Sequence, residues 1–277
     1  AQKAFHKYEL EKNAFGQAKS LNAIGFFYYY QSKYDSANNY FNKAIIASKL
    51  AKDTITWSKA IGNLGLIESA IANYQKAAEL LFQSLKLAES MHNSDSSFLA
   101  GRYLDASNPL ILNSQNREGL ELVKKGVNIG EKINDKRILS NGYNSLASIY
   151  LNIHEYDSAE YYLLKSIEIK QSLNNLSGLS KSYNNLAQLK IDTKDYKNAL
   201  KYVQQALKIA IDYGNQYEIA SCYNSEGLCY IKLEDYKKAI SPLQEAIKNA
   251  EEIEAINLKY VAHTNLAEAY YYLKNYI

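Results

Sequence analysis

Proline, arginine and cysteine are scarce in this chain of 277 residues. Two residues are proline and two are cysteine, and only Arg102, Arg117 and Arg137 are arginine among 32 basic residues. So few prolines argue against long loops and against a β fold with many turns. No run of 18 apolar residues occurs, so we expect no helix of this stretch to span a membrane.

Charges of the two signs nearly balance. The 32 basic residues face 29 acidic ones, which leaves a formal net charge of +3. A protein that binds nucleic acid or an anionic membrane usually carries a clear basic excess or stripe. We therefore expect neither nucleic acid nor a membrane surface among the partners of this stretch.

Cys222 and Cys229 are the only cysteines. On one helix they would be about 10 Å apart along the axis, whereas a disulfide needs Cα atoms within about 7 Å. We expect both thiols to be free. Free thiols favour a reducing, cytoplasmic compartment, although a periplasmic location stays open if the chain belongs to a membrane-bound sensor.

Motifs that carry chemistry are missing. The sequence contains no HExxH, no CxxC, no glycine-rich phosphate loop and no GxSxG. Its four histidines lie in separate repeats and form no pair with metal-ligand spacing. We expect no catalytic residue, no metal and no cofactor, and hence no enzyme activity in this stretch.

What the sequence does contain is a repeat of about 40 residues. Each copy has a helix-period apolar run, a short break and a second helix-period run, and in three copies an acidic residue stands directly before a tyrosine at the break, as in "NLAQLKIDTKDYKNALKYVQQALKI". One copy is degenerate and has Asn116 in the tyrosine position. The tyrosines at the break are Tyr34, Tyr74, Tyr156, Tyr196, Tyr236 and Tyr276.

Small residues recur at fixed distances from these tyrosines. In the second run they allow two helices to cross closely, and apolar residues at spacings of three and four complete a helical hairpin. A single hairpin cannot bury its apolar face, so stacked hairpins and an all-α solenoid are predicted. The two series are Ala37, Ala77, Gly119, Ala159, Ala199 and Ala239, and Gly25, Gly65, Ser107, Ala147, Ala187 and Gly227.

This rhythm of small residue, tyrosine, alanine and aliphatic residue resembles the tetratricopeptide repeat family over essentially the whole chain. The usual period of that family is about 34 residues. The stretch "YNNLAQL" at residues 183–189 is similar to the longer repeats of kinesin light chain and of Rap-type regulators. The resemblance implies a right-handed superhelix whose first helices line a concave, ligand-binding face.

The repeats divide the chain into a single array. Residues 1–13 align with the end of a preceding repeat, and residues 256–277 with the first part of a seventh, so we expect a longer array of which this chain is a part. The six complete repeats are predicted at residues 14–53, 54–95, 96–135, 136–175, 176–215 and 216–255. Pro109 and Pro242 fall inside predicted helices, where they predict either a tolerated kink or a bent groove.

Asparagines line the first helices in two neighbouring positions. An amide offers both a donor and an acceptor, so such a row could hold the main chain of an extended peptide; related long repeats use asparagines in this way. The alternative is that they bond neighbouring backbone and stabilise the stack. The residues are Asn22, Asn144, Asn184 and Asn224 in one position and Asn63, Asn185 and Asn265 in the next.

Aromatic residues cluster near both ends. Phe26, Tyr29 and Tyr30 are predicted to face the groove with Tyr28 packed inside, and Tyr271 is predicted to face it at the other end; core packing is the alternative. The carboxylate clamp of chaperone-binding members of the family does not carry over, because Asp105 would repel a terminal carboxylate.

Two functions are compatible with these patterns. The first is a peptide-binding or protein-binding sensory region of a larger bacterial signalling protein. This one rests on similarity to the repeat arrays that precede histidine kinase or transcription-regulator domains in Bacteroidota. The second is a freestanding adaptor that holds partners together. The sequence does not determine the oligomeric state.

Overall fold

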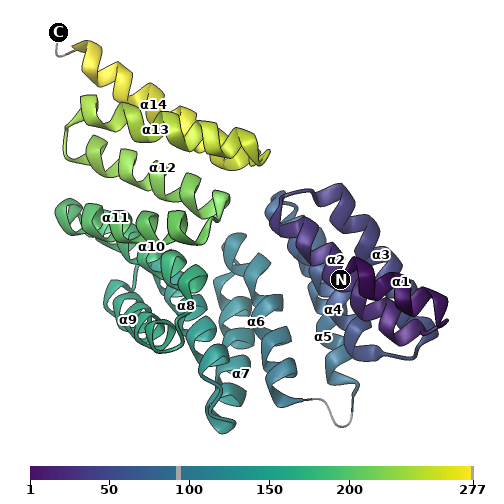
Figure 1. Cartoon of the computed structure of the whole chain (residues 1–277). Helices are drawn as coiled ribbons and strands as arrows, with labels where there is room; N and C mark the ends of the chain where they lie inside the picture. The colour runs from purple at the N-terminus through teal and green to yellow at the C-terminus, as the bar shows by residue number, and fades with distance from the viewer. Residues whose placement is uncertain (92–94, 276–277) are drawn as a thin grey trace. The chain divides into compact units, whose positions relative to one another are not determined.

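The computed structural model describes residues 1–91 and 95–275, which form fourteen α-helices and contain no strand (Figure 1). The predicted all-α fold is confirmed. Tyr276 lies outside the described residues. The helices are α1 (Gln2–Leu10), α2 (Ala14–Tyr30), α3 (Tyr34–Leu50), α4 (Thr54–Ala70), α5 (Tyr74–Glu89), α6 (Ser96–Leu112), α7 (Asn116–Lys132), α8 (Lys136–Asn152), α9 (Tyr156–Ser172), α10 (Leu176–Asp192), α11 (Tyr196–Tyr213), α12 (Gln216–Lys232), α13 (Tyr236–Glu252) and α14 (Ile256–Asn275).

Most helices have 17 residues and are followed by a connection of three. The residues at the predicted breaks are the first residues of the second helices in the described part of the chain; they are Tyr34, Tyr74, Asn116, Tyr156, Tyr196 and Tyr236. The connections after first and second helices have the same geometry. The middle residue of each has a positive φ, for example Ala72 (61°) and His154 (62°), and Gly214 (78°) is the one glycine at such a place among the described residues.

The chain forms two compact units, residues Ala1–Ile138 and Leu139–Ile277. Within each unit the helices follow one another as antiparallel pairs (Figure 1). In the first unit α2 packs beside α4 and α4 beside α6; in the second unit α10 packs beside α12 and α12 beside α14. The first helices of successive hairpins therefore make a layer of their own in each unit. We call the surface of this layer the first-helix face.

The predicted small residues lie where the two helices of a hairpin cross. Ala37, Ala159 and Ala239 are completely buried. The glycines of the first helices face the largest buried side chains of the second helices: a Cβ at Gly25 would lie 2.7 Å from Phe41 Cδ1, and one at Gly227 would lie 2.4 Å from Leu243 Cγ. Such contacts leave no room for a larger residue, which explains the recurrence of small residues in the sequence.

Both prolines lie inside continuous helices. Helix α6 continues through Pro109 to Leu112, and α13 continues through Pro242 to Glu252. Pro109 is buried close to the end of its helix, so that few backbone hydrogen bonds follow it. No helix in the described part of the chain has the length and apolar character that crossing a membrane requires.

Candidate functional site

The asparagines of the first-helix face bond to one another across neighbouring helices. In each pair Nδ2 of the asparagine on the later helix donates to Oδ1 of the asparagine on the earlier helix, over 41 residues of sequence. We call these pairs the amide ladder. They are Asn63 to Asn22 at 3.0 Å between α4 and α2, Asn185 to Asn144 at 3.3 Å between α10 and α8, and Asn265 to Asn224 at 2.9 Å between α14 and α12.

Each pair leaves hydrogen-bonding groups unused. The Asn22–Asn63 pair uses one donor of Asn63 and one acceptor position of Asn22, and no further contact of these amides is present among the described residues. Both side chains are half-buried. The nitrogen of Asn22 and the oxygen of Asn63 are therefore left to bond water or a ligand. Because all three pairs have the same direction, each leaves the NH₂ group of the earlier asparagine and the oxygen of the later one outside the bond between them; Asn144 is the one buried member, at 8% exposed.

Asn184 belongs to the predicted series but not to a pair. Its Nδ2 donates to Ser221 Oγ of α12 at 3.2 Å, and its Oδ1 is buried without a partner among the described residues. Ser225 stands on α12 where the other pairs have an asparagine, and no bond joins its shorter side chain to Asn184. The structure thus leaves Asn184 with an unsatisfied acceptor and brings the other six predicted asparagines into three pairs, Asn22 with Asn63, Asn144 with Asn185 and Asn224 with Asn265.

The ladder is interrupted in the first unit by a charged pair. Gly62 and Asp105 take the positions of Asn22 and Asn63 at the next helix junction. Arg102 Nη2 lies 2.5 Å from Asp105 Oδ2, and a Cβ at Gly62 would lie 2.5 Å from Arg102 Nη1. The guanidinium therefore occupies the space above the glycine. Burial raises the pKa of the Asp105 carboxyl, and the Arg102 charge lowers it.

Arg102 also offsets the charge on which the predicted repulsion of a terminal carboxylate rests. Its guanidinium lies 5.3 Å from the centre of the Phe98 ring, close enough for a cation–π interaction. The Arg102 Nε atom is buried and has no partner in the described part of the chain. This junction consequently presents a nearly neutral ion pair and an aromatic ring rather than two amides.

The aromatic residues near the start of the chain form a connected cluster. The ring centres of Phe26 and Tyr30 are 4.7 Å apart, edge to face, and those of Phe26 and Tyr29 are 6.0 Å apart. Phe26 and Tyr29 pack against the buried core around Phe41, while Tyr30 is 60% exposed. Tyr28 stacks on Tyr40 of α3 at 5.3 Å, as predicted for an inward residue. Of the three predicted groove residues here, Tyr30 is the most exposed.

Tyr271 near the other end of the chain is 65% exposed. Its ring meets the edge of Tyr272 at 5.3 Å, and Tyr272 in turn stacks on Tyr236 at 5.1 Å. Tyr271 is thus held by neighbouring rings with most of its surface uncovered. A role of Tyr271, or of Phe26, Tyr29 and Tyr30, in binding a ligand stays a prediction.

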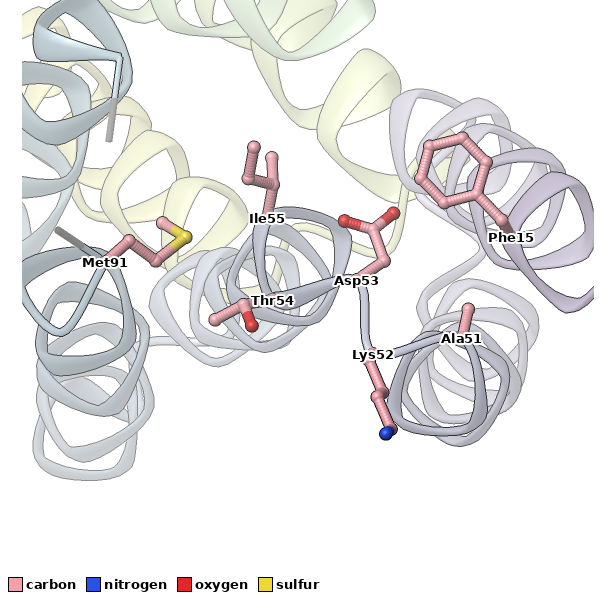
Figure 2. A pocket seen from close by; sticks show the side chains of 7 residues that line it. All are labelled: Phe15, Ala51, Lys52, Asp53, Thr54, Ile55 and Met91. Carbon is pink, nitrogen blue, oxygen red and sulfur yellow. The ribbon is translucent and has the colours of Figure 1, made fainter. Parts of the chain in front are cut away.

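A surface hollow of about 310 Å³ lies in the first unit, away from the positions that the sequence indicated. Figure 2 shows Phe15 and Ile55 on either side of the Asp53 carboxylate. Asp53 Oδ1 accepts the main-chain N–H of Thr56 at 3.1 Å and so caps α4. This hollow has an apolar wall and a carboxylate engaged in holding its own helix. Its lining consists of Phe15, Ala51, Lys52, Asp53, Thr54, Ile55 and Met91.

The two cysteines are both free, as predicted, and both are completely buried. Burial, and to a smaller extent nearby carboxylates (Glu218 and Glu226 for Cys222, Glu226 for Cys229), raise the pKa of each thiol to about 12. Neither sulfur is therefore a nucleophile or a metal ligand at neutral pH. Among residues 1–91 and 95–275, no three His, Cys, Asp or Glu side chains come together so as to hold a metal ion.

Sequence reasoning missed Lys170. This lysine of α9 is only 2% exposed, and its Nζ donates to Ser182 Oγ at 2.8 Å. A signal was present in the repeat, because every other complete repeat has a small residue at this position. Those residues are Ser48, Ala88, Gly130, Ala210 and Ala250.

Comparison with protein-family models identifies the repeat to which part of these helical hairpins belongs. Residues 140–173 and residues 178–252 each match a family model described as a tetratricopeptide repeat. Both matches lie in the part of the chain where spacing and small residues are most regular. Together with the hairpin fold, they define an α-solenoid scaffold. Residues 140–173 and 178–252 are therefore tetratricopeptide repeats, the remaining hairpins share their fold, and scaffolds of this kind mediate protein–protein interaction.

Solved structures with the same fold come from several settings. A Rap protein complexed with competence and sporulation factor has a TM-score of 0.66 and 12% identity, over 96% of this chain and 79% of that one. A signal transduction ATPase with a tetratricopeptide repeat sensor, from Pyrococcus horikoshii, has a TM-score of 0.65 and 17% identity, over 91% of this chain and 38% of that one. BtubC from P. vanneervenii has a TM-score of 0.61 and 18% identity, over 78% of this chain and 91% of that one.

These identities are low enough that the similarity shows the fold alone. A sequence comparison with curated proteins finds no match.

Proposed function

We propose that the first-helix face binds an extended peptide or protein segment and that the chain is the ligand-sensing region of a bacterial signalling protein. The observation that carries the proposal is the amide ladder. Its three pairs present donors and acceptors in the same order, and a peptide main chain offers an N–H and a C=O at nearly every residue.

The spacing of the ladder suits an extended chain. Helices in contact are about 8–10 Å apart, and an extended strand advances about 3.3 Å per residue. A peptide that crosses the first helices would therefore meet a new helix junction about every third residue. In the second unit α10 packs beside α12 and α12 beside α14, so such a segment would follow a continuous row of first helices, with Asn184 in place of an amide pair between α10 and α12.

Main-chain recognition of this kind gives affinity without reading a sequence. Selectivity would come from the places where the ladder is replaced by something else. The Arg102–Asp105 pair is such a place, and exposed Tyr30 and Tyr271, on the helices that carry Asn22 and Asn265, would add side-chain contacts beside the amide pairs. Tyrosine is a favourable contact residue because its apolar ring ends in a hydroxyl.

Two of the similar structures support a sensory role. One is a Rap protein with a bound factor, and the other is described as a signal transduction ATPase whose repeats are its sensor. By analogy, a bound ligand would shift the relative stability of neighbouring hairpins, and an effector domain such as a histidine kinase or transcription regulator would respond. The chain itself has no catalytic role in this proposal.

A freestanding adaptor is the second candidate. It is favoured by BtubC, because this chain covers 91% of that one, so that almost the whole BtubC chain consists of the same fold. An adaptor would bind segments of two partners with the same face and would pass no signal.

The binding proposal can be tested without a known ligand. Peptides would be selected from a random display library on the immobilised chain, and their affinities measured by calorimetry. The double change Asn144→Ala with Asn185→Ala should weaken a selected peptide at least tenfold. A matched double change on second helices, Asn198→Ala with Asn249→Ala, should leave affinity unchanged. Equal affinities for all three proteins would overturn the proposal.

A further inference from the structure

Lys170 places an ammonium group at a position where every other complete repeat has a small residue. Its side chain is 2% exposed and fits because the facing residue of α10 is Gly178, at which a Cβ would lie 3.0 Å from Lys170 Cε. The same exchange of sizes occurs at Tyr8, whose ring lies 2.4 Å from the place of a Cβ at Gly16. Lys170 is therefore accommodated by the backbone of the next helix.

The Lys170 ammonium group is connected to the amide ladder by a series of hydrogen bonds. Lys170 Nζ donates to Ser182 Oγ at 2.8 Å, Ser182 Oγ donates to Asn144 Oδ1 at 3.0 Å, and Asn185 Nδ2 donates to the same oxygen at 3.3 Å. A buried charge on a second helix is thus joined, through one hydroxyl, to an amide pair on the first-helix face.

The direction of this chain of bonds follows from its first member. An ammonium group can only donate, so the Ser182 oxygen accepts from Lys170 and the Ser182 proton goes to another acceptor. Ser166 Oγ, 3.4 Å away, gives its own proton to the main-chain oxygen of Ser140 at 2.7 Å. Asn144 Oδ1 is the acceptor at the better distance.

We propose that Lys170 is a positioning residue that fixes, through Ser182, the direction in which the Asn144–Asn185 pair presents its donor and acceptor to a ligand. This inference rests on the proposed function of the first-helix face. Asn144 is 8% exposed and its Oδ1 accepts two bonds, so its NH₂ group is the donor left for a ligand, and Asn185 keeps its oxygen as the acceptor. A ligand carbonyl would then meet Asn144, and a ligand N–H would meet Asn185.

At the other junctions of the ladder no serine stands in the position of Ser182, so these junctions act as internal controls. Ala60 and Ala262 stand in the position of Ser182 beside the Asn22 and Asn224 pairs. Cys222 stands there beside Asn184, whose Oδ1 has no partner among the described residues. Only the Asn144 oxygen of the described ladder therefore accepts both a hydroxyl and an amide.

The hydrogen bonds from Lys170 to Asn144 should depend on pH, because a neutral amine can accept a hydrogen bond as well as donate one. Burial, and to a smaller extent the positive charge of Lys181 on α10, lower the pKa of Lys170 to about 7, and Glu218 on α12 raises it. The groups of α8 on this side, Ser140 and Asn144, are uncharged. Once Lys170 loses its proton, the Ser182 hydroxyl can donate to the amine instead. Asn144 Oδ1 then loses one of the two hydrogen bonds that hold its side chain.

The test is a pH titration of the whole chain by NMR, with no peptide present. The Lys170 Cε signal and the side-chain amide signals of Asn144 and Asn224 are followed from acidic to alkaline pH. The Asn144 signals are expected to shift with the Lys170 midpoint, close to about 7, and the Asn224 signals to show no such transition. Asn144 signals that stay fixed while Lys170 titrates would overturn the proposal.

Variants separate a relay of hydrogen bonds from a field acting through space. In Ser182→Ala, Lys170 keeps its charge, so the Asn144 transition is expected to disappear; its persistence would overturn the proposal. In Lys181→Met the relay is intact, and the shared midpoint should move to higher pH because a neighbouring positive charge is gone. Since no peptide is used, failure of peptide binding in the display experiment leaves this result unchanged, and the two failures are distinguishable.

Discussion

Asn63 Nδ2 donates to Asn22 Oδ1 at 3.0 Å, across 41 residues of sequence and between two first helices. The bond ties one repeat to the next on the face where a ligand is proposed to bind. It also orients both amides, so that the same contact contributes to stacking and to the order of donors and acceptors on the surface.

A double-mutant cycle should reveal this bond. Asn22→Ala, Asn63→Ala and the double variant are unfolded in urea, and the coupling free energy is expected to be about 0.5–1.5 kcal/mol, the usual net value of one hydrogen bond. Asn22 and Asn184, which belong to different compact units, provide the control cycle and should show coupling close to zero. A zero coupling for Asn22 and Asn63 would mean that the pair does not form in solution.

The glycine at the helix crossing of the sixth repeat should tolerate no methyl group. A Cβ at Gly227 would meet three Leu243 side-chain atoms between 2.4 and 3.1 Å. Gly227→Ala is expected to lower the free energy of unfolding by about 1–3 kcal/mol through overpacking. Calorimetric or urea unfolding measures the loss.

A second change should recover part of that loss. In the fifth repeat the same crossing pairs Ala187 with Val203, and both residues are completely buried. Adding Leu243→Val to Gly227→Ala recreates this combination and should restore stability relative to Gly227→Ala alone. A double variant less stable than Gly227→Ala would show that the crossing distance is not set by this pair.

A left-handed turn residue offers a stabilising substitution. Ala72 has a φ of 61° in the connection between α4 and α5. A residue with a Cβ is strained in this region, whereas glycine is not. Ala72→Gly should therefore raise the free energy of unfolding by about 0.5–1 kcal/mol. Ala51 has a φ of −78°, and there the same substitution should lower stability.

Replacing Lys170 by methionine should stabilise the protein most at low pH. A buried charge without an opposite charge in contact is costly, so Lys170→Met is expected to gain about 1–4 kcal/mol at and below neutral pH. The ordinary lysine pKa is 10.5 and the folded one is about 7, so between these values the unfolded chain binds more protons. Wild-type stability attributable to this residue therefore rises with pH over that window.

The advantage of Lys170→Met over the wild type should accordingly shrink as pH rises above 7. Urea unfolding of both proteins at several pH values measures it. Lys181→Met, which removes a charge of the same sign from α10, serves as the control for a general charge effect. A constant difference between Lys170→Met and wild type across the window would contradict a buried ammonium at Lys170.

Much of the fold could be predicted from the sequence because the repeat constrains it strongly. The tyrosines of the repeat that the structure describes, such as Tyr34, begin the second helices, and the small residues at Ala37 and Gly25 lie at helix crossings. These features depend on backbone periodicity and on volume, both of which are visible in one chain that repeats itself. The division into two compact units at Ile138 has no counterpart in the repeat pattern.

The site was predictable only in part. The sequence shows the asparagine positions and allows two bonding partners for them, a ligand or the neighbouring backbone. In the structure the amides bond to one another instead. Such pairing depends on rotamers and on the offset between neighbouring helices, which spacing along the sequence does not contain. Lys170 was detectable as the large residue in a column of small ones, but its bond to Ser182 was not, since it joins different helices.

The most direct test of a ligand-binding first-helix face is to observe its amides while a selected peptide binds. In a ¹⁵N NMR titration, the side-chain amide signals of Asn22 and Asn63, or of Asn144, Asn185 and Asn224, should shift with a common saturation curve. The signals of Asn198 on α11 and Asn249 on α13 should stay in place, because second helices do not contribute to the face. Shifts confined to Asn198 and Asn249 would contradict the account.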